Sequence, residues 1–136
     1  MTCLWHGSRV IPTFRAMHVL IVEDDAAVRS TFVRALVQAG FTTHEAASVP
    51  DAVAVLKRQS VDAIVCDFTL PGMDGSTLHQ RLLEVAPEVA ERIVFVTGWA
   101  RDPKTRALLD HTGQPLLEKP VELNDLIAQV RRVAGA

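Results

Sequence analysis

The chain has 136 residues, the size of one domain, and its 49% apolar and 22% charged residues are typical of a folded protein rather than a disordered one. A net charge of −2 and an aromatic content of 5%, with no tyrosine, argue against nucleic-acid binding. Its apolar runs are too short for a membrane span, and two distant cysteines, Cys3 and Cys66, suggest no disulfide framework. We therefore expect a cytoplasmic protein.

The first sixteen residues differ in charge from the rest. They contain Arg9 and Arg15 and no acid, a charge of +2, which leaves −4 for residues 17–136. They show neither the continuous apolar region nor the small-residue cleavage site of a signal peptide. Their apolar residues allow a short strand or a partner-binding arm, but a mobile extension is the simpler interpretation. We predict an extension over 1–16 and a domain over 17–136.

Beyond residue 16, short apolar runs alternate with amphipathic segments. The apolar runs predict strands over 18–22, 42–46, 61–66, 92–96 and 115–117. The amphipathic segments predict helices over 28–39, 50–56, 78–86, 103–109 and 123–133, and the segment 71–75 is typical of a loop. Gly40 follows the first helix as a stop, and Ser48 is a candidate cap of the second. Five such units predict the α/β class, a parallel sheet with helices on both faces in three layers.

Polar side chains follow four of the predicted strands. In parallel sheets of this kind, ligands bind and reactions take place at the carboxyl ends of the strands. The polar side chains are Glu23, Asp24 and Asp25 after the first strand, Asp67 after the third, Thr97 after the fourth, and Lys119 after the fifth. Each has an ordinary structural interpretation when taken alone. Asp25 suits the cap of the first helix, Asp67 an Asx turn, Thr97 a hydroxyl that closes a turn, and Lys119 a surface position.

Taken together, these residues predict a site. If the first and third strands are neighbours, Glu23, Asp24 and Asp67 meet in one pocket. Two carboxylates about 4 Å apart repel by roughly 4 kcal/mol at an effective dielectric near 20. Such a cluster requires protonation or a hard cation, and oxygen ligands suit Mg²⁺. With a lysine and a hydroxyl as additional donors, the pocket suits a phosphoryl group and a carboxylate nucleophile.

From Met17 to about Val133 the chain resembles a response regulator receiver domain, the phospho-acceptor module of two-component signalling. The motifs that carry the resemblance are V-E-D-D at 22–25, C-D-F-T-L-P-G-M-D-G at 66–75, V-T-G at 96–98 and E-K-P at 118–120. Their intervals are those of the family, and the stretch 105–120 also resembles receivers of hybrid sensor histidine kinases. The resemblance implies a flavodoxin-like, doubly wound, five-stranded parallel sheet of strand order 2-1-3-4-5.

The resemblance also assigns a metal site. It implies that Asp67 is the phospho-acceptor and that Asp24 and Asp67 ligate Mg²⁺ or Mn²⁺ together with the backbone carbonyl of Thr69. Glu23 is implied to act through water or as the second acid of the pair. The spacing of the motifs leaves Asp25 as the helix cap.

Two further residues receive roles from the resemblance. Lys119 is implied to bridge to a phosphoryl oxygen, with a cis bond between it and Pro120. Thr97 is implied to bind the aspartyl phosphate and to draw its loop inward, which switches the surface around the fourth helix, fifth strand and fifth helix.

Two positions depart from the common pattern of the family. Leu116 stands where an aromatic residue is usual, three positions before the lysine, so we hypothesise that signal transmission does not use a rotating ring; simple packing is the alternative. Trp99 lies two residues beyond Thr97. We predict that its indole shields the acyl phosphate from water, with a role as a partner contact as the alternative.

The sequence therefore predicts a stand-alone receiver that takes a phosphoryl group from a histidine kinase or a histidine phosphotransfer protein. It would act as a relay or as a switch for a downstream protein, as a monomer or weak homodimer, without turning over an external substrate. The alternative is a phosphorylation-independent interaction module with a receiver fold. A phosphatase is disfavoured, because Thr69 stands where such an enzyme would need a second carboxylate.

Overall fold

The structure, a computed structural model, describes residues 2–6, 9–13, 16–69 and 75–135. Its main sheet has five parallel strands in the order β4-β3-β5-β6-β7. Their bounds are β3 His18–Val22, β4 Thr42–Ala46, β5 Ala63–Asp67, β6 Ile93–Thr97 and β7 Leu116–Glu118. Numbered among themselves, these strands follow the order 2-1-3-4-5, so the predicted flavodoxin-like topology is confirmed.

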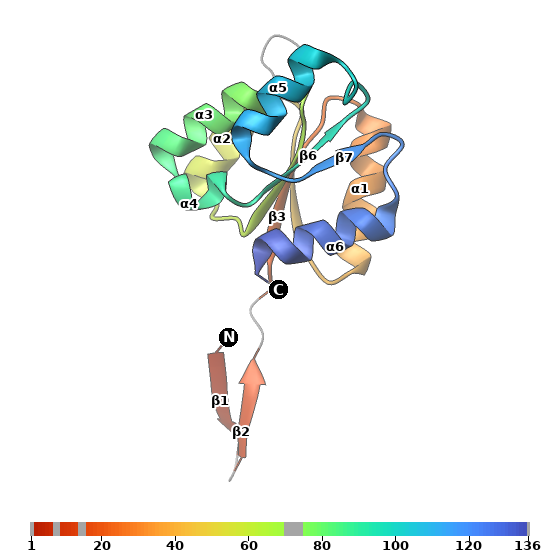
Figure 1. The fold of residues 1–136 in the computed structure, drawn as a ribbon. Coiled ribbons are helices and arrows are strands. Elements are labelled where there is room, and N and C mark those ends of the chain that lie inside the picture. Colours follow the sequence, from red (N-terminus) through yellow and green to blue (C-terminus); the bar gives the residue numbers. More distant parts are fainter. Residues whose placement is uncertain (1, 7–8, 14–15, 70–74, 136) are drawn as a thin grey trace.

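Helices cover both faces of this sheet (Figure 1). They are α1 Ala26–Gln38, α2 Val49–Arg58, α3 Gly75–Val85, α4 Pro87–Ala90, α5 Pro103–Thr112 and α6 Leu123–Ala134. α1 and α6 pack on one face, where Phe32, Leu36 and Leu126 are buried. The helices α2 to α5 pack on the other, where the core includes Leu82 and Leu109. Alternate strand residues enter the two cores, which produces the predicted three layers.

Residues at the helix ends explain where the helices begin and stop. The Asp25 carboxylate accepts hydrogen bonds from the backbone N–H groups of Ala27 (2.9 Å) and Val28 (3.1 Å), as predicted for the cap of α1. Ser48 caps α2 in the same way. Gly40, at a φ of 100°, turns the chain after α1.

The N-terminal segment forms a separate antiparallel hairpin of β1 Thr2–His6 and β2 Arg9–Thr13 (Figure 1). In the described part of the chain these two strands pair with each other and not with the five-stranded sheet. The strand that the sequence left open as an alternative is therefore present. The mobility of the extension over 1–16 stays a prediction, and so does the domain boundary at residue 17.

Two further details differ from the expected elements or lie outside the described residues. The sequence patterns missed α4, a four-residue helix with Pro87 in its first turn. Of the predicted loop over 71–75, residues 71–74 lie outside the described residues, and Gly75 begins α3. None of the helices in the described residues has the length and apolarity that a bilayer crossing requires.

Candidate functional site

The polar residues that follow the strands meet at one edge of the sheet. β3 and β5 are neighbours, with Val22 opposite Cys66, so the next residues along each strand, Glu23 and Asp67, lie side by side. Both side chains are buried. The sequence argument required this neighbourhood, and the structure confirms it.

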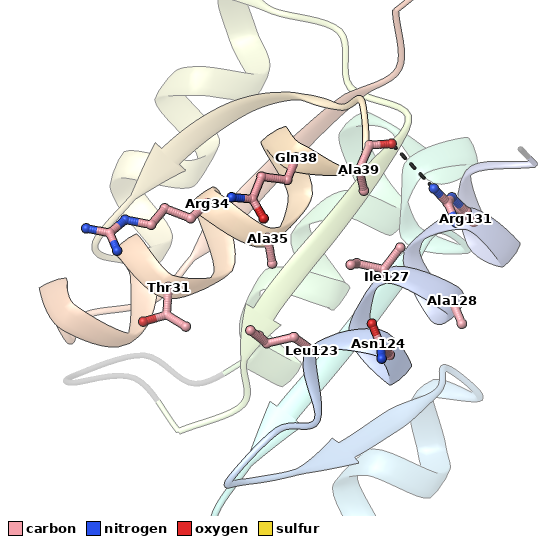
Figure 2. A pocket seen from close by; sticks show the side chains of 10 residues that line it. All are labelled: Thr31, Arg34, Ala35, Gln38, Ala39, Leu123, Asn124, Ile127, Ala128 and Arg131. Carbon is pink, nitrogen blue, oxygen red and sulfur yellow. Dashed lines mark hydrogen bonds between the residues drawn. The ribbon is translucent and has the colours of Figure 1, made fainter.

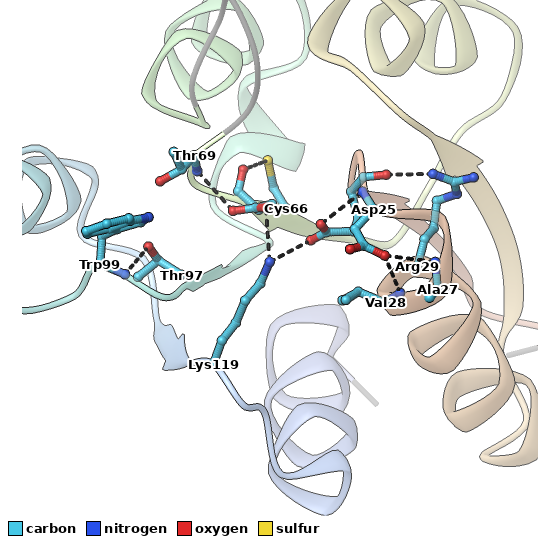
Figure 3. A network of polar contacts seen from close by, with 11 residues as sticks. Asp25, Ala27, Val28, Arg29, Cys66, Thr69, Thr97, Trp99 and Lys119 are labelled. Atoms are coloured by element: carbon cyan, nitrogen blue, oxygen red, sulfur yellow. Dashed lines mark hydrogen bonds and ion pairs between the residues drawn. The ribbon is translucent and has the colours of Figure 1, made fainter.

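Lys119 joins the two buried carboxylates (Figure 3). Its Nζ donates to Glu23 Oε2 at 3.2 Å and to Asp67 Oδ2 at 3.1 Å. Burial lowers the pKa of Lys119, but its hydrogen bonds and ion pairs with Asp67 and Glu23 outweigh that effect and raise the pKa. The lysine is therefore a cation held inside the site, and its interpretation as a solvated surface residue is wrong.

Three carboxylates cluster beside this lysine. Glu23, Asp24 and Asp67 each place one oxygen within 4.8 Å of the others, and Asp24 is the exposed member. Burial, followed by the negative charge of Asp67, raises the pKa of Glu23 from 4.5 to about 7. An all-oxygen set of this kind fits Mg²⁺ or Mn²⁺, because hard cations prefer carboxylate ligands and relieve their mutual repulsion.

Asp67 and Thr97 are also tied to their own loops. The backbone N–H of Thr69 donates to Asp67 Oδ1 at 3.0 Å, and the N–H of Trp99 donates to Thr97 Oγ1 at 3.0 Å. Thr97 is fully buried at the end of β6, whereas the Trp99 side chain is 65% exposed (Figure 3). Thr97 comes directly after Val96, the residue of β6 opposite Asp67, so it lies next to the carboxylate cluster. The role of the Thr69 carbonyl as a metal ligand stays a prediction.

The strand that leads to the lysine is short and only partly buried. Leu116 begins β7 opposite Phe95 of β6 and packs against the core under α2 to α5. The peptide bond between Lys119 and Pro120 is cis, as the resemblance implied. Leu116 therefore packs as the alternative interpretation expected. Its role in signal transmission stays a hypothesis.

Sequence reasoning missed Arg29. Its Nη1 donates to the backbone carbonyl of Glu23 at 2.8 Å, and its Nε pairs with Glu45 Oε1 at 3.0 Å. The signal available in the sequence was a basic residue in the first turns of the helix that follows the acidic pair. That signal is weak, since an arginine on a helix is usually solvated.

A groove of about 750 Å³ lies elsewhere, between α1 and α6 (Figure 2). Leu123 and Ile127 contribute apolar surface, and Arg34 and Arg131 are among its polar residues. Arg131 also donates to the carbonyl of Ala39 at the end of α1. The carboxylates and lysine of the site described above do not line this groove.

Comparisons with known proteins match most of the chain. The family model described as "Response regulator receiver domain" matches residues 19–131. The chain is 38% identical over 117 residues to the sensor kinase CckA of Brucella abortus, which covers 85% of this chain and 12% of that protein. It is 30% identical over 118 residues to the response regulator receiver protein CpdR of the same organism, covering 85% of this chain and 94% of CpdR.

The fold has a close match among solved structures. The crystal structure of a CheY-like response regulator receiver domain protein from Methanospirillum hungatei superposes with a TM-score of 0.81. It covers 89% of this chain and 95% of its own at 23% identity, a level at which the likeness supports the fold alone.

Proposed function

This chain belongs to the response regulator receiver domain family, and we propose that it is a phospho-acceptor in two-component signalling. In this proposal Asp67 takes a phosphoryl group from the phosphohistidine of a histidine kinase or a histidine phosphotransfer protein. The observation that carries the proposal is the position of the Lys119 Nζ, within hydrogen-bonding distance of two buried carboxylates, Asp67 and Glu23.

The chemistry follows from what these side chains do. A carboxylate oxygen of Asp67 forms a bond to phosphorus as the bond between phosphorus and the histidine nitrogen breaks, which leaves an acyl phosphate. Asp67 is oriented for this step by the N–H of Thr69 and by Lys119. Lys119 also supplies positive charge for the phosphoryl oxygens.

A bound Mg²⁺ or Mn²⁺ would neutralise further charge on the phosphoryl oxygens, held by Asp24 and Asp67 with Glu23 and the Thr69 carbonyl. The cluster of carboxylate oxygens supports this assignment. The chain would thereby assist its own phosphorylation and dephosphorylation, and we propose no turnover of an external substrate.

Thr97 is the proposed sensor of the product. Its hydroxyl accepts from the Trp99 N–H, and binding of that hydroxyl to the new phosphoryl group would move the loop after β6. The surface that would change is formed by α5, β7 and α6, where a downstream protein would bind. We also propose the cytoplasm as the compartment, in line with a sequence whose two cysteines, Cys3 and Cys66, lie far apart.

The test is incubation of the chain with a small acyl phosphate and Mg²⁺, followed by intact mass measurement. We expect a stable adduct of one phosphoryl group that is absent in Asp67→Asn. Asp110→Asn, a change of the same kind at an exposed position of α5, is the matched control and should retain the adduct. A parent chain without any adduct would instead support the interaction module, and continuous hydrolysis of the donor would support a phosphatase.

A further inference from the structure

The backbone of Glu23 is fixed on both sides where β3 ends. Its N–H donates to the carbonyl of Ala46 at 3.0 Å, which extends the pairing with β4 by one residue. Its carbonyl accepts from Arg29 Nη1 at 2.8 Å (Figure 3). A side chain from α1 thus binds the carbonyl at the point where the strand leaves the sheet.

Arg29 itself is held at two points. Besides the Glu23 carbonyl, its Nε contacts Glu45 Oε1 at 3.0 Å on β4, and the arginine side chain is 20% exposed against 52% for Glu45. A planar guanidinium bound through two of its nitrogens has a fixed orientation, which a lysine cannot reproduce. Arg29 therefore links α1, the end of β3 and the edge strand β4.

This link reaches Asp24 through the backbone. The carbonyl of Glu23 and the N–H of Asp24 belong to one planar peptide unit, so fixing the carbonyl also fixes the direction in which the chain enters Asp24. Asp24 is the exposed member of the three-carboxylate cluster, whereas Glu23 and Asp67 are held by burial and by Lys119. The orientation of Asp24 thus depends more on its backbone than that of the other two.

We propose that Arg29 is a positioning residue for divalent-cation binding, which holds the Glu23–Asp24 peptide unit so that the Asp24 carboxylate faces Asp67. This inference rests on the proposed function. Arg29 acts through the backbone and contacts neither the metal nor the phosphoryl group. Groups that orient metal ligands in this way typically contribute a factor of about 10 to 100 in metal affinity.

The test measures Mg²⁺ binding to the full chain by titration calorimetry, without a phosphoryl donor. Removal of a positive charge near a cation site should by itself tighten Mg²⁺ binding, whereas loss of positioning should weaken it. We expect Arg29→Gln to raise the Mg²⁺ Kd about tenfold. Arg34→Gln removes the same charge from the same helix, in the groove between α1 and α6, and should not weaken binding.

Two further variants complete the test. Arg29→Met keeps the aliphatic stem and should weaken binding as Arg29→Gln does, so it replaces that variant if Arg29→Gln does not fold. Arg29→Lys should recover part of the affinity, because its ammonium can still reach the Glu23 carbonyl. At saturating Mg²⁺, the rate of adduct formation in Arg29→Gln should return to that of the parent.

Two results would overturn the inference and leave the proposed function intact. One is a Kd in folded Arg29→Gln or Arg29→Met that equals or improves on that of the parent. The other is a phosphorylation defect that saturating Mg²⁺ does not correct. A parent chain that binds no Mg²⁺ would overturn both the inference and the metal-dependent mechanism.

Discussion

At Asp67 the two carboxylate oxygens have different partners, the Thr69 N–H on Oδ1 and the Lys119 ammonium on Oδ2. The first contact is the Asx turn that the sequence suggested as the ordinary interpretation, and the second belongs to the site. Thr97 shows the same combination, because its hydroxyl closes a turn with Trp99 in the position where the proposed sensor must stand. The structural and functional interpretations of these residues are therefore compatible.

Glu23 leads to a prediction about pH. Its pKa of about 7 in the fold lies above its ordinary value of 4.5, so without metal its contribution to stability is complete below pH 4.5 and is lost as the pH rises through 7. A cation favours the ionised carboxylate and must displace the proton. We expect the affinity for Mg²⁺ to rise by about tenfold between pH 6 and 8, as follows for one group that titrates near pH 7.

Titration calorimetry at several pH values would measure this change, with Glu23→Gln as the control. Glu23→Gln should bind Mg²⁺ more weakly and with a much flatter pH dependence. An affinity of the parent that does not change over this range would contradict a coupling between the Glu23 proton and the metal.

The exposed side chain of Trp99 leads to a prediction about the lifetime of the phosphorylated form. Its side chain is 65% exposed, and its backbone contacts Thr97 beside the carboxylate cluster. If the indole excludes water from the acyl phosphate, Trp99→Ala should shorten the lifetime of the phosphorylated form severalfold. The decay would be followed by intact mass, with Leu83→Ala, an exposed position on α3, as the control. An unchanged lifetime would leave the partner-contact interpretation of Trp99.

At the scale of elements, the segment between β3 and α1 has two adjacent aspartates with different surroundings. Asp25 binds the first N–H groups of α1, and Asp24 belongs to the carboxylate cluster. We expect Asp25→Ala to lower the free energy of unfolding by about 1 kcal/mol, the usual value of a helix cap, with Mg²⁺ affinity nearly unchanged. Asp24→Ala should weaken Mg²⁺ binding strongly and leave the free energy of unfolding nearly unchanged.

Thermal unfolding and Mg²⁺ titration on the two variants would separate these roles. If Asp25→Ala lost Mg²⁺ binding while Asp24→Ala kept it, the spacing of the motifs would have assigned the wrong pair of residues to the metal.

Local patterns predicted the elements well where burial and capping act on neighbouring residues. The stripe that includes Phe32 and Leu36 identified α1, and Asp25 and Gly40 mark its ends as expected. The patterns missed α4, because four residues are too few to show a helical period. They also missed Arg29, because its acceptor is a backbone carbonyl that becomes available only after the sheet has formed.

For the whole molecule, the sequence predicted the layers from the alternation of apolar runs and amphipathic helices, but the strand order came from the resemblance. The periodicity of apolar residues predicts which residues are buried, but it does not predict which strands are neighbours in the sheet. The contact of Lys119 with Glu23 joins residues 96 positions apart, and it depends on that strand order. The residues of the site were thus predictable by type and position, whereas the distances between them required the folded sheet.

The N-terminal hairpin leads to a prediction about the stability of a chain that lacks it. The carbonyl of Met17 accepts from the N–H of Thr42 at 2.9 Å, and its side chain packs against the core under α1 and α6, which supports the predicted start of the domain at this residue. The hairpin of β1 and β2 forms its own sheet, and a two-stranded hairpin alone contributes little stability.

A chain that begins at Met17 should therefore unfold within about 2 °C of the parent, a difference of less than ~1 kcal/mol. It should also keep the Mg²⁺ affinity and form the phosphoryl adduct at the same rate, because the carboxylates and Lys119 lie entirely within residues 17–136. A clearly lower midpoint would show that the hairpin packs on the domain and that residues 1–16 belong to the folded unit.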